Sequence, residues 1–343
     1  MPDLPVVSLI IPAFNEEKYI GTVLGQLLAQ DYPPGKMEIL VMDGGSSDRT
    51  REIVNGFAEK NPGIRLLINE RQYVPFALNL GIREAIGDPV LIIGSHSEYP
   101  PDYITRLVSA SGELKADNVG GLCVARPPDD TVKSLAIAKA ISCPFGVGNA
   151  HFRIGSKTIK KVDTVTFGCY RRSVFDKIGF FDEELIRNQD DEFNARLAKS
   201  GGSIYLIPDV SVTYFTRDKV KSIVRMFYQY GLFKPLVSYK IGKPTTMRQM
   251  VPPAFTLFLI LCPLGIWIHP YFAYLLAAGL GSYILADLGY TLSLSYAASQ
   301  GRLVFYLPWL FFLLHISYGW GYLKGMFAFL VLRKRKKEIL SSR

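Results

Sequence analysis

The chain is poor in the residues that build disulfide frameworks and clustered metal centres. Its 343 residues include four histidines and four cysteines, and no two of the cysteines form a CxxC pair. The cysteines are Cys123, Cys143, Cys169 and Cys262. This spacing excludes a disulfide scaffold and a cysteine-based zinc site, so we interpret all four as reduced structural residues.

The N-terminus lacks the basic region of a secretory signal. Its first apolar run, within MPDLPVVSLIIP, is short and ends at Pro12. This pattern predicts a buried strand rather than a signal peptide, so the N-terminal domain is expected to stay in the cytoplasm. The net charge of +9 is not accompanied by an RNA- or DNA-binding motif, and nucleic acid is not an expected partner.

Long apolar runs are confined to the C-terminal third of the chain. Residues 250–332 contain about three of them, each long enough to cross a bilayer, and a buried core helix is the alternative for each. Residues 216–249 mix basic with aromatic residues and predict amphipathic helices at the membrane interface, with an ordinary surface helix as the alternative. The basic tail, residues 333–343, predicts contact with anionic membrane lipids. Three crossings would place this tail outside, against the positive-inside tendency, so one run is expected to be re-entrant or interfacial.

Residues 1–215 alternate apolar runs with helical patterns. The strands are expected at residues 6–11, 37–43, 64–69 and 89–94, and the helices between them at 19–30, 49–60 and 74–86. This order predicts a parallel sheet that is covered on both faces. Ligands bind such sheets where the strands end, so Pro12–Glu16, Asp43–Asp48 and Gly94–Glu98 are expected to meet at one edge.

Four motifs resemble a known family. SLIIPAFNEEKYI, VMDGGSSDRT and NERQYVPFALNLGIREAIGD precede the edge of the fourth strand, and VDTVTFGCYRRSVFDKIGFFDEELIRNQDDEFNARLAKSGG follows at 162–202. Together they resemble the inverting family 2 glycosyltransferases, most closely the membrane-attached succinoglycan-type glucosyltransferases of exopolysaccharide assembly. The resemblance implies an α/β fold of the GT-A type with a mostly parallel central sheet, followed by interfacial and transmembrane helices.

The resemblance also implies a set of nucleotide-binding residues. Pro12, Phe14 and Glu16 would line the nucleoside pocket, and Asp43 would accept a hydrogen bond from a uracil ring. The remaining nucleotide-binding candidates are Arg71 and Ser95.

The fourth strand edge, Gly94-Ser95-His96-Ser97-Glu98, stands where the family carries Asp-x-Asp or Asp-x-His. In the family this motif holds the donor diphosphate through a divalent metal ion. Gly94 replaces the first Asp, and His96 with Glu98 would form a minimal metal site. Because one ligand is an imidazole, Mn²⁺ is expected in preference to Mg²⁺. The alternative is that His96 is an ordinary edge residue.

The acceptor half carries the predicted catalytic base. In RNQDDEFNAR the resemblance assigns this role to Asp190, with Asp191 in reserve, although an acidic helix start would look the same. Gln189, Arg126 and Lys234 are the candidates for contact with the diphosphate or the acceptor, and Gly168, Tyr170 and Arg171 for the acceptor groove.

The predicted function is inverting, metal-dependent transfer of a sugar from a UDP-linked donor to a polyprenyl-diphosphate-linked saccharide. The reaction would take place at the cytoplasmic face of the cell membrane, in exopolysaccharide or other surface glycan assembly. One alternative is a polyprenyl-phosphate sugar synthase. A non-enzyme alternative is a donor-binding scaffold that lost catalysis with the Asp at position 94.

Overall fold

The structure, a computed structural model, describes residues 4–244 and 246–332, which form two compact units. The first runs to Val124 and resumes over Gly155–Tyr214, and the second comprises Ala125–Ile154 and the chain from Phe215 onward. The predicted domain of residues 1–215 is therefore interrupted, because residues 125–154 group with the C-terminal helices. Apolar packing explains this grouping, since α5 (Val132–Ala140) and α6 (Pro144–Val147) contact α13 (Leu307–Gly325) within the second unit.

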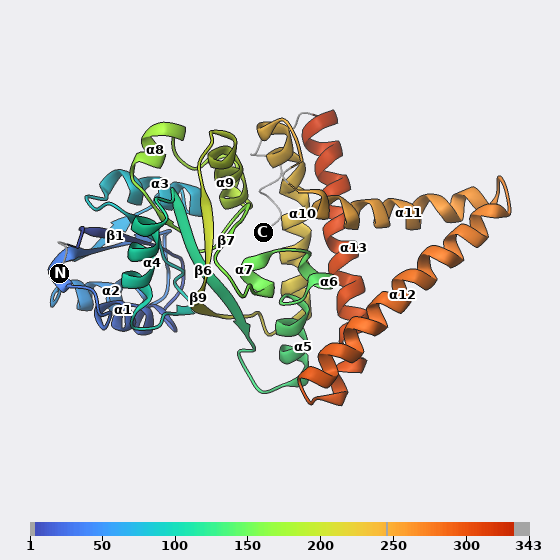
Figure 1. The fold of residues 1–343 in the computed structure, drawn as a ribbon, viewed down its shortest axis with the longest axis horizontal. Helices are drawn as coiled ribbons and strands as arrows, with labels where there is room; N and C mark the ends of the chain where they lie inside the picture. The colour runs from blue at the N-terminus through green and yellow to red at the C-terminus, as the bar shows by residue number, and fades with distance from the viewer. Residues whose placement is uncertain (1–3, 245, 333–343) are drawn as a thin grey trace. The chain divides into compact units, whose positions relative to one another are not determined.

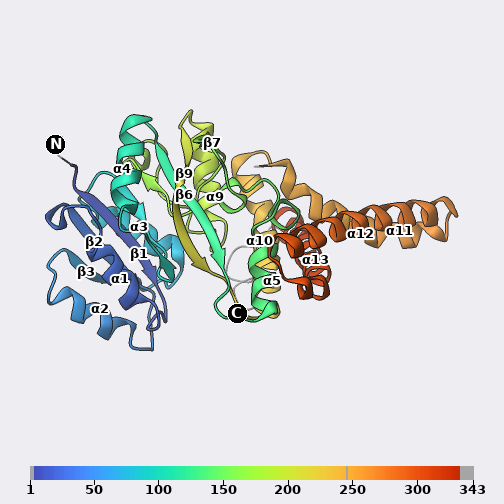
Figure 2. The same cartoon turned by 60° about the horizontal axis from the view of Figure 1, so that its bottom comes forward.

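One half of the sheet in the first unit is parallel, as the alternating pattern predicts. Its strands follow the order β3–β2–β1–β4 (Figure 2). They are β1 (Val7–Ala13), β2 (Met37–Asp43), β3 (Ile64–Ile68) and β4 (Val90–Ile92). Ala13 pairs with Asp43, and Asp43 pairs with Ile68, so these strands end at one level. The helices that connect them are α1 (Ile20–Leu28), α2 (Thr50–Ala58) and α3 (Val74–Glu84), each within a few residues of its predicted place.

The rest of the sheet contains antiparallel pairs, so the complete sheet is mixed. β8 (Cys169–Tyr170) pairs with both β4 and β6 (Asn118–Arg126). The order then continues through β9 (Ile204–Phe215) to β5 (Ser97–Glu98), and β7 (Lys160–Lys161) pairs with β9. The helices of this half are α4 (Tyr103–Glu113), α8 (Ser173–Ile178) and α9 (Gln189–Lys199).

Helices cover both faces of the parallel strands. Alternate residues of β1, from Val7 to Ala13, join the buried apolar cluster that α1 and α4 complete. Ile10, which points to the opposite face, lies against Gly81 of α3. A strand buried on both faces needs a continuous apolar run, which explains why VVSLII reads without polar alternation.

The second unit is helical. Besides α5, α6 and α13 it contains α7 (His151–Ile154), α10 (Val220–Ile241), α11 (Val251–Ile266) and α12 (Tyr271–Ala297). Short turns accompany these helices: the 3₁₀ turns η2 (Met247–Met250) and η3 (Gly301–Phe305) and a π-helical turn over Met326–Val331, while η1 (Pro34–Lys36) lies in the first unit.

The third predicted apolar run forms α13, which packs along α10 (Figure 1). Gly231 of α10 faces the backbone of Tyr318, and Gly321 and Gly325 of α13 face the backbone of α10 from Tyr228 to Leu232. Residue numbers increase in the same direction along the contact in both helices, so the two helices run parallel. Glycines let the two backbones approach closely, and any side chain at these positions would force them apart.

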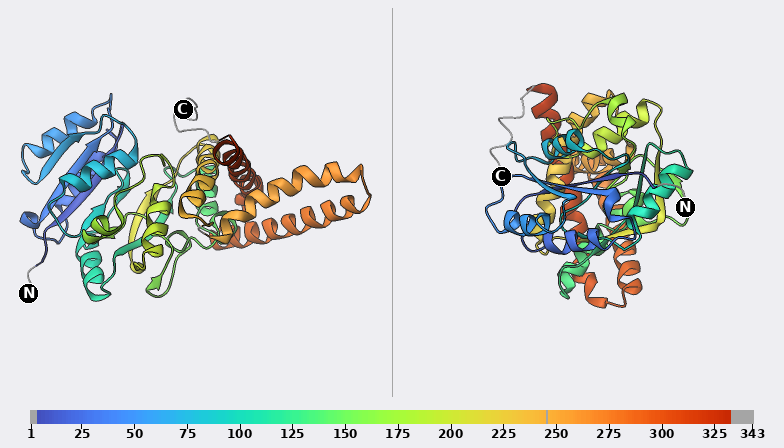
Figure 3. Two further views of the ribbon diagram at one scale, coloured as in Figure 1. Left: turned by 90° about the horizontal axis from the view of Figure 1, so that it is seen from above. Right: turned by 90° about the vertical axis from the view of Figure 1, so that its left-hand side faces the viewer.

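Two other helices are long and apolar enough to cross a membrane. They span Met247–Ile266 and Tyr271–Ala297, and only 22% and 6% of their apolar windows are buried in the structure. A core helix of a soluble domain would be mostly buried, and neither helix is. Figure 3 shows the pair extending away from α10 and α13.

The glycine contact between α10 and α13 can be tested directly. Gly321→Ala should lower the stability of the detergent-solubilised protein by about 1–3 kcal/mol, the usual cost of overpacking, because the new Cβ would meet the backbone of α10. Gly289→Ala is the control, since that exposed α12 position has no neighbour within 4 Å. It should be neutral or stabilising by about 0.5–1 kcal/mol, the helix preference of Ala over Gly. Equal melting temperatures for the two variants would contradict the packing described.

Candidate active site

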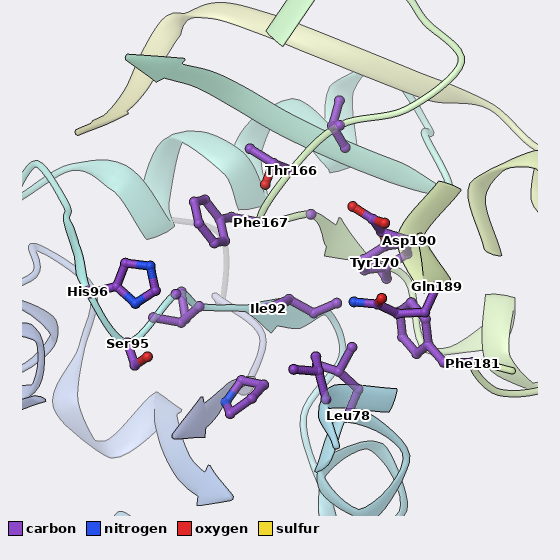
Figure 4. Close-up of a pocket in the computed structure, with 16 residues that line it drawn as sticks. Leu78, Ile92, Ser95, His96, Thr166, Phe167, Tyr170, Phe181, Gln189 and Asp190 are labelled. Atoms are coloured by element: carbon purple, nitrogen blue, oxygen red, sulfur yellow. The ribbon is translucent and has the colours of Figure 1, made fainter. Parts of the chain in front are cut away.

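A pocket in the first unit opens where β1 and β4 end. Pro12 of β1 lines it, and Ser95 and His96, which follow β4, lie along one side (Figure 4). Gln189 and Asp190, at the start of α9, lie on the other side, and Figure 4 shows their side chains directed into it. Five residues predicted from positions far apart in the sequence therefore share one pocket.

Asp190 occupies the first turn of α9. The turn begins after Asn188, whose φ of 60° places it in the left-handed region. The Asp190 side chain is exposed and accepts a hydrogen bond from the backbone N–H of Asp191 at 2.9 Å. Asp191, the reserve candidate for the base, is not among the pocket residues. Of the two adjacent carboxylates, only Asp190 faces the pocket.

His96 is oriented by a carboxylate. Its Nδ1 lies 3.2 Å from Oε1 of Glu16, and 42% of its side chain is exposed. An ionised carboxylate can only accept a hydrogen bond, so this geometry requires the hydrogen on Nδ1. The lone pair of a neutral His96 is then on Nε2. The rings of Tyr19 and Tyr214, with centroids 6.3 and 5.9 Å away, flank the imidazole.

Gly94 has no room for a side chain. A Cβ built on it would lie 2.6 Å from Cε1 of Phe167 and 2.7 Å from Cζ of the same ring. Real Cβ atoms essentially never come this close to a carbon. The Phe167 ring therefore occupies the space that the first Asp of the metal motif would need.

Tyr170 brings a neutral hydroxyl close to Asp190. Burial, and after it the negative charge of Asp190, raises the pKa of Tyr170 well above its ordinary value. The hydroxyl also lies 3.4 Å from Oδ1 of Asn194 on α9. Gly168 and Tyr170, two of the candidates for the acceptor groove, line the pocket. The third candidate, Arg171, points elsewhere and donates to the carbonyl of Ser111.

Asp43, predicted to contact the base, is fully buried in a local network. Its Oδ2 accepts from Nε of Arg51 at 2.6 Å and from the backbone N–H of Gly45 at 3.1 Å. The N–H of Ser46 lies 3.2 Å from each carboxylate oxygen. With 0% of its side chain exposed, Asp43 could reach a ligand only if Arg51 or this turn moved.

The other predicted residues lie outside this pocket. Phe14 is 46% exposed, and the guanidinium of Arg71 lies 5.8 Å from the ring centroid of Phe76. Glu98 is in β5, paired with Thr213 of β9. Arg126 and Lys234 belong to the second unit. The carbonyl of Arg126 accepts a hydrogen bond from the backbone N–H of Thr216. Lys234, on α10, is only 3% exposed.

The acidic and imidazole groups do not converge as they do in a closed metal site. Within residues 4–244 and 246–332, no three His, Cys, Asp or Glu side chains come together as a metal-binding group. The nearest approach to one is the Glu16–His96 pair, of which His96 lines the pocket. A metal ion here would depend on oxygen atoms supplied by its substrate.

Sequence reasoning missed the apolar wall of the pocket. Val74 and Leu78 of α3 line it, together with Phe167 and Phe181. These residues read as ordinary core positions, so nothing in the sequence distinguished them. The one available signal was Gly94, because the loss of a side chain there implies that another group fills the space.

Comparison with known proteins agrees with this geometry. The model of Glycosyl transferase family 2 matches residues 8–179. The dolichyl N-acetyl-alpha-D-glucosaminyl phosphate 3-beta-D-2,3-diacetamido-2,3-dideoxy-beta-D-glucuronosyltransferase of Methanococcus voltae is 30% identical over 93% of this chain and 97% of its own length. The succinoglycan biosynthesis protein ExoA of Rhizobium meliloti is 26% identical over 88% of this chain and 92% of its own length.

A solved structure shares the fold over nearly the whole chain. It is the mannosyltransferase PcManGT from Pyrobaculum calidifontis, in complex with GDP-Man and Mn²⁺. The two superpose with a TM-score of 0.58 over 95% of this chain and 88% of the other, at 21% identity. At this identity the likeness is one of fold.

Proposed function

Because the chain belongs to glycosyltransferase family 2, we propose that it transfers a sugar from a UDP-linked donor to a polyprenyl-phosphate- or diphosphate-linked saccharide at the cytoplasmic membrane face. The observation that carries the proposal is the single pocket that holds both His96 and Asp190. The relative from Methanococcus voltae supports the acceptor class, since its name specifies a dolichyl phosphate sugar as acceptor. The same name specifies a transferred sugar with two acetamido groups.

Asp190 is the general base in this proposal. It would take the proton of the acceptor hydroxyl as that oxygen attacks the anomeric carbon, while the nucleoside diphosphate leaves on the His96 side. One direct displacement inverts the configuration and needs no covalent intermediate. The hydroxyl of Tyr170 beside Asp190 stays neutral, so it adds no second negative charge next to the proposed base.

His96 would bind a divalent metal ion through Nε2. The hydrogen bond from Nδ1 to Glu16 has the arrangement of a metal-binding histidine held by an outer carboxylate. The ion would supply charge neutralisation to the leaving diphosphate, and Mn²⁺ suits the nitrogen ligand. Glu98 stays a predicted second ligand, and Glu16 is proposed to orient His96 in addition to its predicted nucleoside contact.

The two exposed helices α11 and α12 would cross the membrane as a hairpin. The chain at the open end of this hairpin carries Lys243, Arg248 and Arg302, whereas the connecting residues 267–270 contain no Lys or Arg. By the positive-inside tendency the basic end is cytoplasmic. Two crossings return the chain to that side, so the basic tail, which lies outside the described residues, would also be cytoplasmic, and α10 and α13 would lie at the interface.

Replacement of the base tests the reaction. Asp190→Asn should lower the rate of sugar transfer to lipid-linked acceptor by about 10²–10⁴-fold, the usual contribution of a general base, and leave UDP binding unchanged. Transfer is measured by thin-layer analysis of radiolabelled lipid products, and binding by calorimetry. Asp191→Asn is the matched control and should remain active. An active Asp190→Asn variant together with an inactive Asp191→Asn variant would assign the general base to Asp191.

Replacement of the imidazole tests the metal. His96→Ala should weaken Mn²⁺-dependent UDP binding by about tenfold or more, equivalent to about 1.4 kcal/mol. Glu16→Gln should weaken it by about tenfold through the orientation of His96, and Glu98→Gln tests the predicted second ligand. Calorimetry with and without Mn²⁺ measures all three. If neither wild type nor His96→Ala responds to Mn²⁺, the site binds its donor without metal.

Cysteine labelling tests the hairpin. The four native cysteines are buried, so an introduced thiol gives a clean signal. A membrane-impermeant maleimide should label Ile268→Cys in intact cells and Gly301→Cys only in inverted vesicles. Both positions are exposed. Labelling of both from the same side would exclude the two crossings.

A further inference from the structure

Gly94 is held in place by a tyrosine. The hydroxyl of Tyr99 accepts from the backbone N–H of Gly94 at 2.6 Å and lies 3.3 Å from the carbonyl oxygen of the same residue, to which it can donate. Tyr99 is 4% exposed, so water does not compete for these bonds. The peptide at position 94 is therefore fixed, and it cannot shift to make room for a side chain.

Phe167 is held just as firmly from the other side. The fully buried Tyr103 donates its hydroxyl to the carbonyl of Phe167 at 3.0 Å. The Tyr99 ring packs edge-on against the Phe167 ring with centroids 6.3 Å apart. Phe167 has a φ of 50°, a left-handed conformation that non-glycine residues rarely adopt. A strained residue that its surroundings fix in one place is a recognised mark of a functional site.

The Phe167 ring lies between the two chemical ends of the pocket. Figure 4 shows it between His96, where the diphosphate would bind, and Asp190, where the acceptor would bind. The donor sugar must occupy the space between those ends. Its wall there is formed by Phe167 with Leu78 and Phe181, and the hydroxyl of Thr166 and the amide of Gln189 are polar groups on the same pocket.

We propose that Phe167, in the space left by Gly94, is a specificity-determining residue that selects a donor whose sugar carries an N-acylamino group. This inference rests on the proposed glycosyl transfer. The acyl methyl would pack on the Phe167 ring, and Thr166 and Gln189 can pair with the amide. A plain hydroxyl could also pair with Thr166 or Gln189, but it has no methyl to cover the Phe167 ring and would lose hydrogen bonds to water wherever it faces that ring.

Donor binding tests the selection. Wild-type protein with Mn²⁺ should bind UDP-N-acetylglucosamine at least tenfold more tightly than UDP-glucose in calorimetry. The variant Phe167→Gly, which tolerates the left-handed backbone, should lose most of this preference and keep its affinity for UDP. Saturation-transfer NMR should show the acetyl methyl in contact with the wild-type protein and much less with the variant.

The outcomes separate the two proposals. Equal affinity of wild type for the two UDP-sugars, with UDP bound, would overturn the specificity role and leave glycosyl transfer standing. Absence of binding to UDP, GDP and their sugars would overturn the proposed function itself.

The steric pairing has its own test. Gly94→Ala should lower the melting temperature of the wild-type protein. The same substitution should lower it less when it is made in the Phe167→Gly variant, where the ring is absent. Strictly additive shifts would show that the two positions do not compete for the same space.

Discussion

The common level at which the parallel strands end is the constraint on which the candidate site depends. Ile10 of β1 pairs with Ile92 of β4, and the N–H of Ile93 continues the ladder to the carbonyl of Ile10. Two residues further along the chain, Pro12 in β1 and Gly94 just beyond the end of β4 both line the pocket. A slip of one residue in this register would turn the pocket-facing residues to the opposite face. Thus the packing of apolar strands fixes where the chemistry can occur.

Much of this arrangement could be predicted, because periodicity and strand order act locally. The four parallel strands, the helices between them and the shared edge follow from apolar runs that end at Pro12, Asp43 and Gly94. The other half of the sheet was harder to foresee, since β5, β7 and β8 are only two residues long and depend on pairing with distant strands. The grouping of residues 125–154 with the C-terminal helices was not predicted for the same reason, because their partner α13 lies more than 150 residues away in sequence.

The second unit shows how similar apolar runs can take different roles. Three runs have similar composition, yet α13 presents glycines that match the backbone of α10, whereas α11 and α12 leave most of their surface uncovered. Mean hydropathy alone therefore does not separate the packed helix from the exposed pair. If the exposed pair crosses the membrane as proposed, the number of crossings is even. The proposal would then remove the conflict between three apolar runs and the positive-inside tendency.

Within the pocket, one exchange links steric fit to electrostatics. In the proposed function, a carboxylate at position 94 would place a further negative charge near the donor diphosphate, and a cation would have to offset the repulsion between them. Gly94 removes that charge, and Phe167 replaces it with an uncharged ring. Glu16 is paired with His96, and Asp190 lies on the far side of the ring. In the proposed function a metal ion would then have less repulsion to offset, so weak ligation by the protein would be compatible with donor binding.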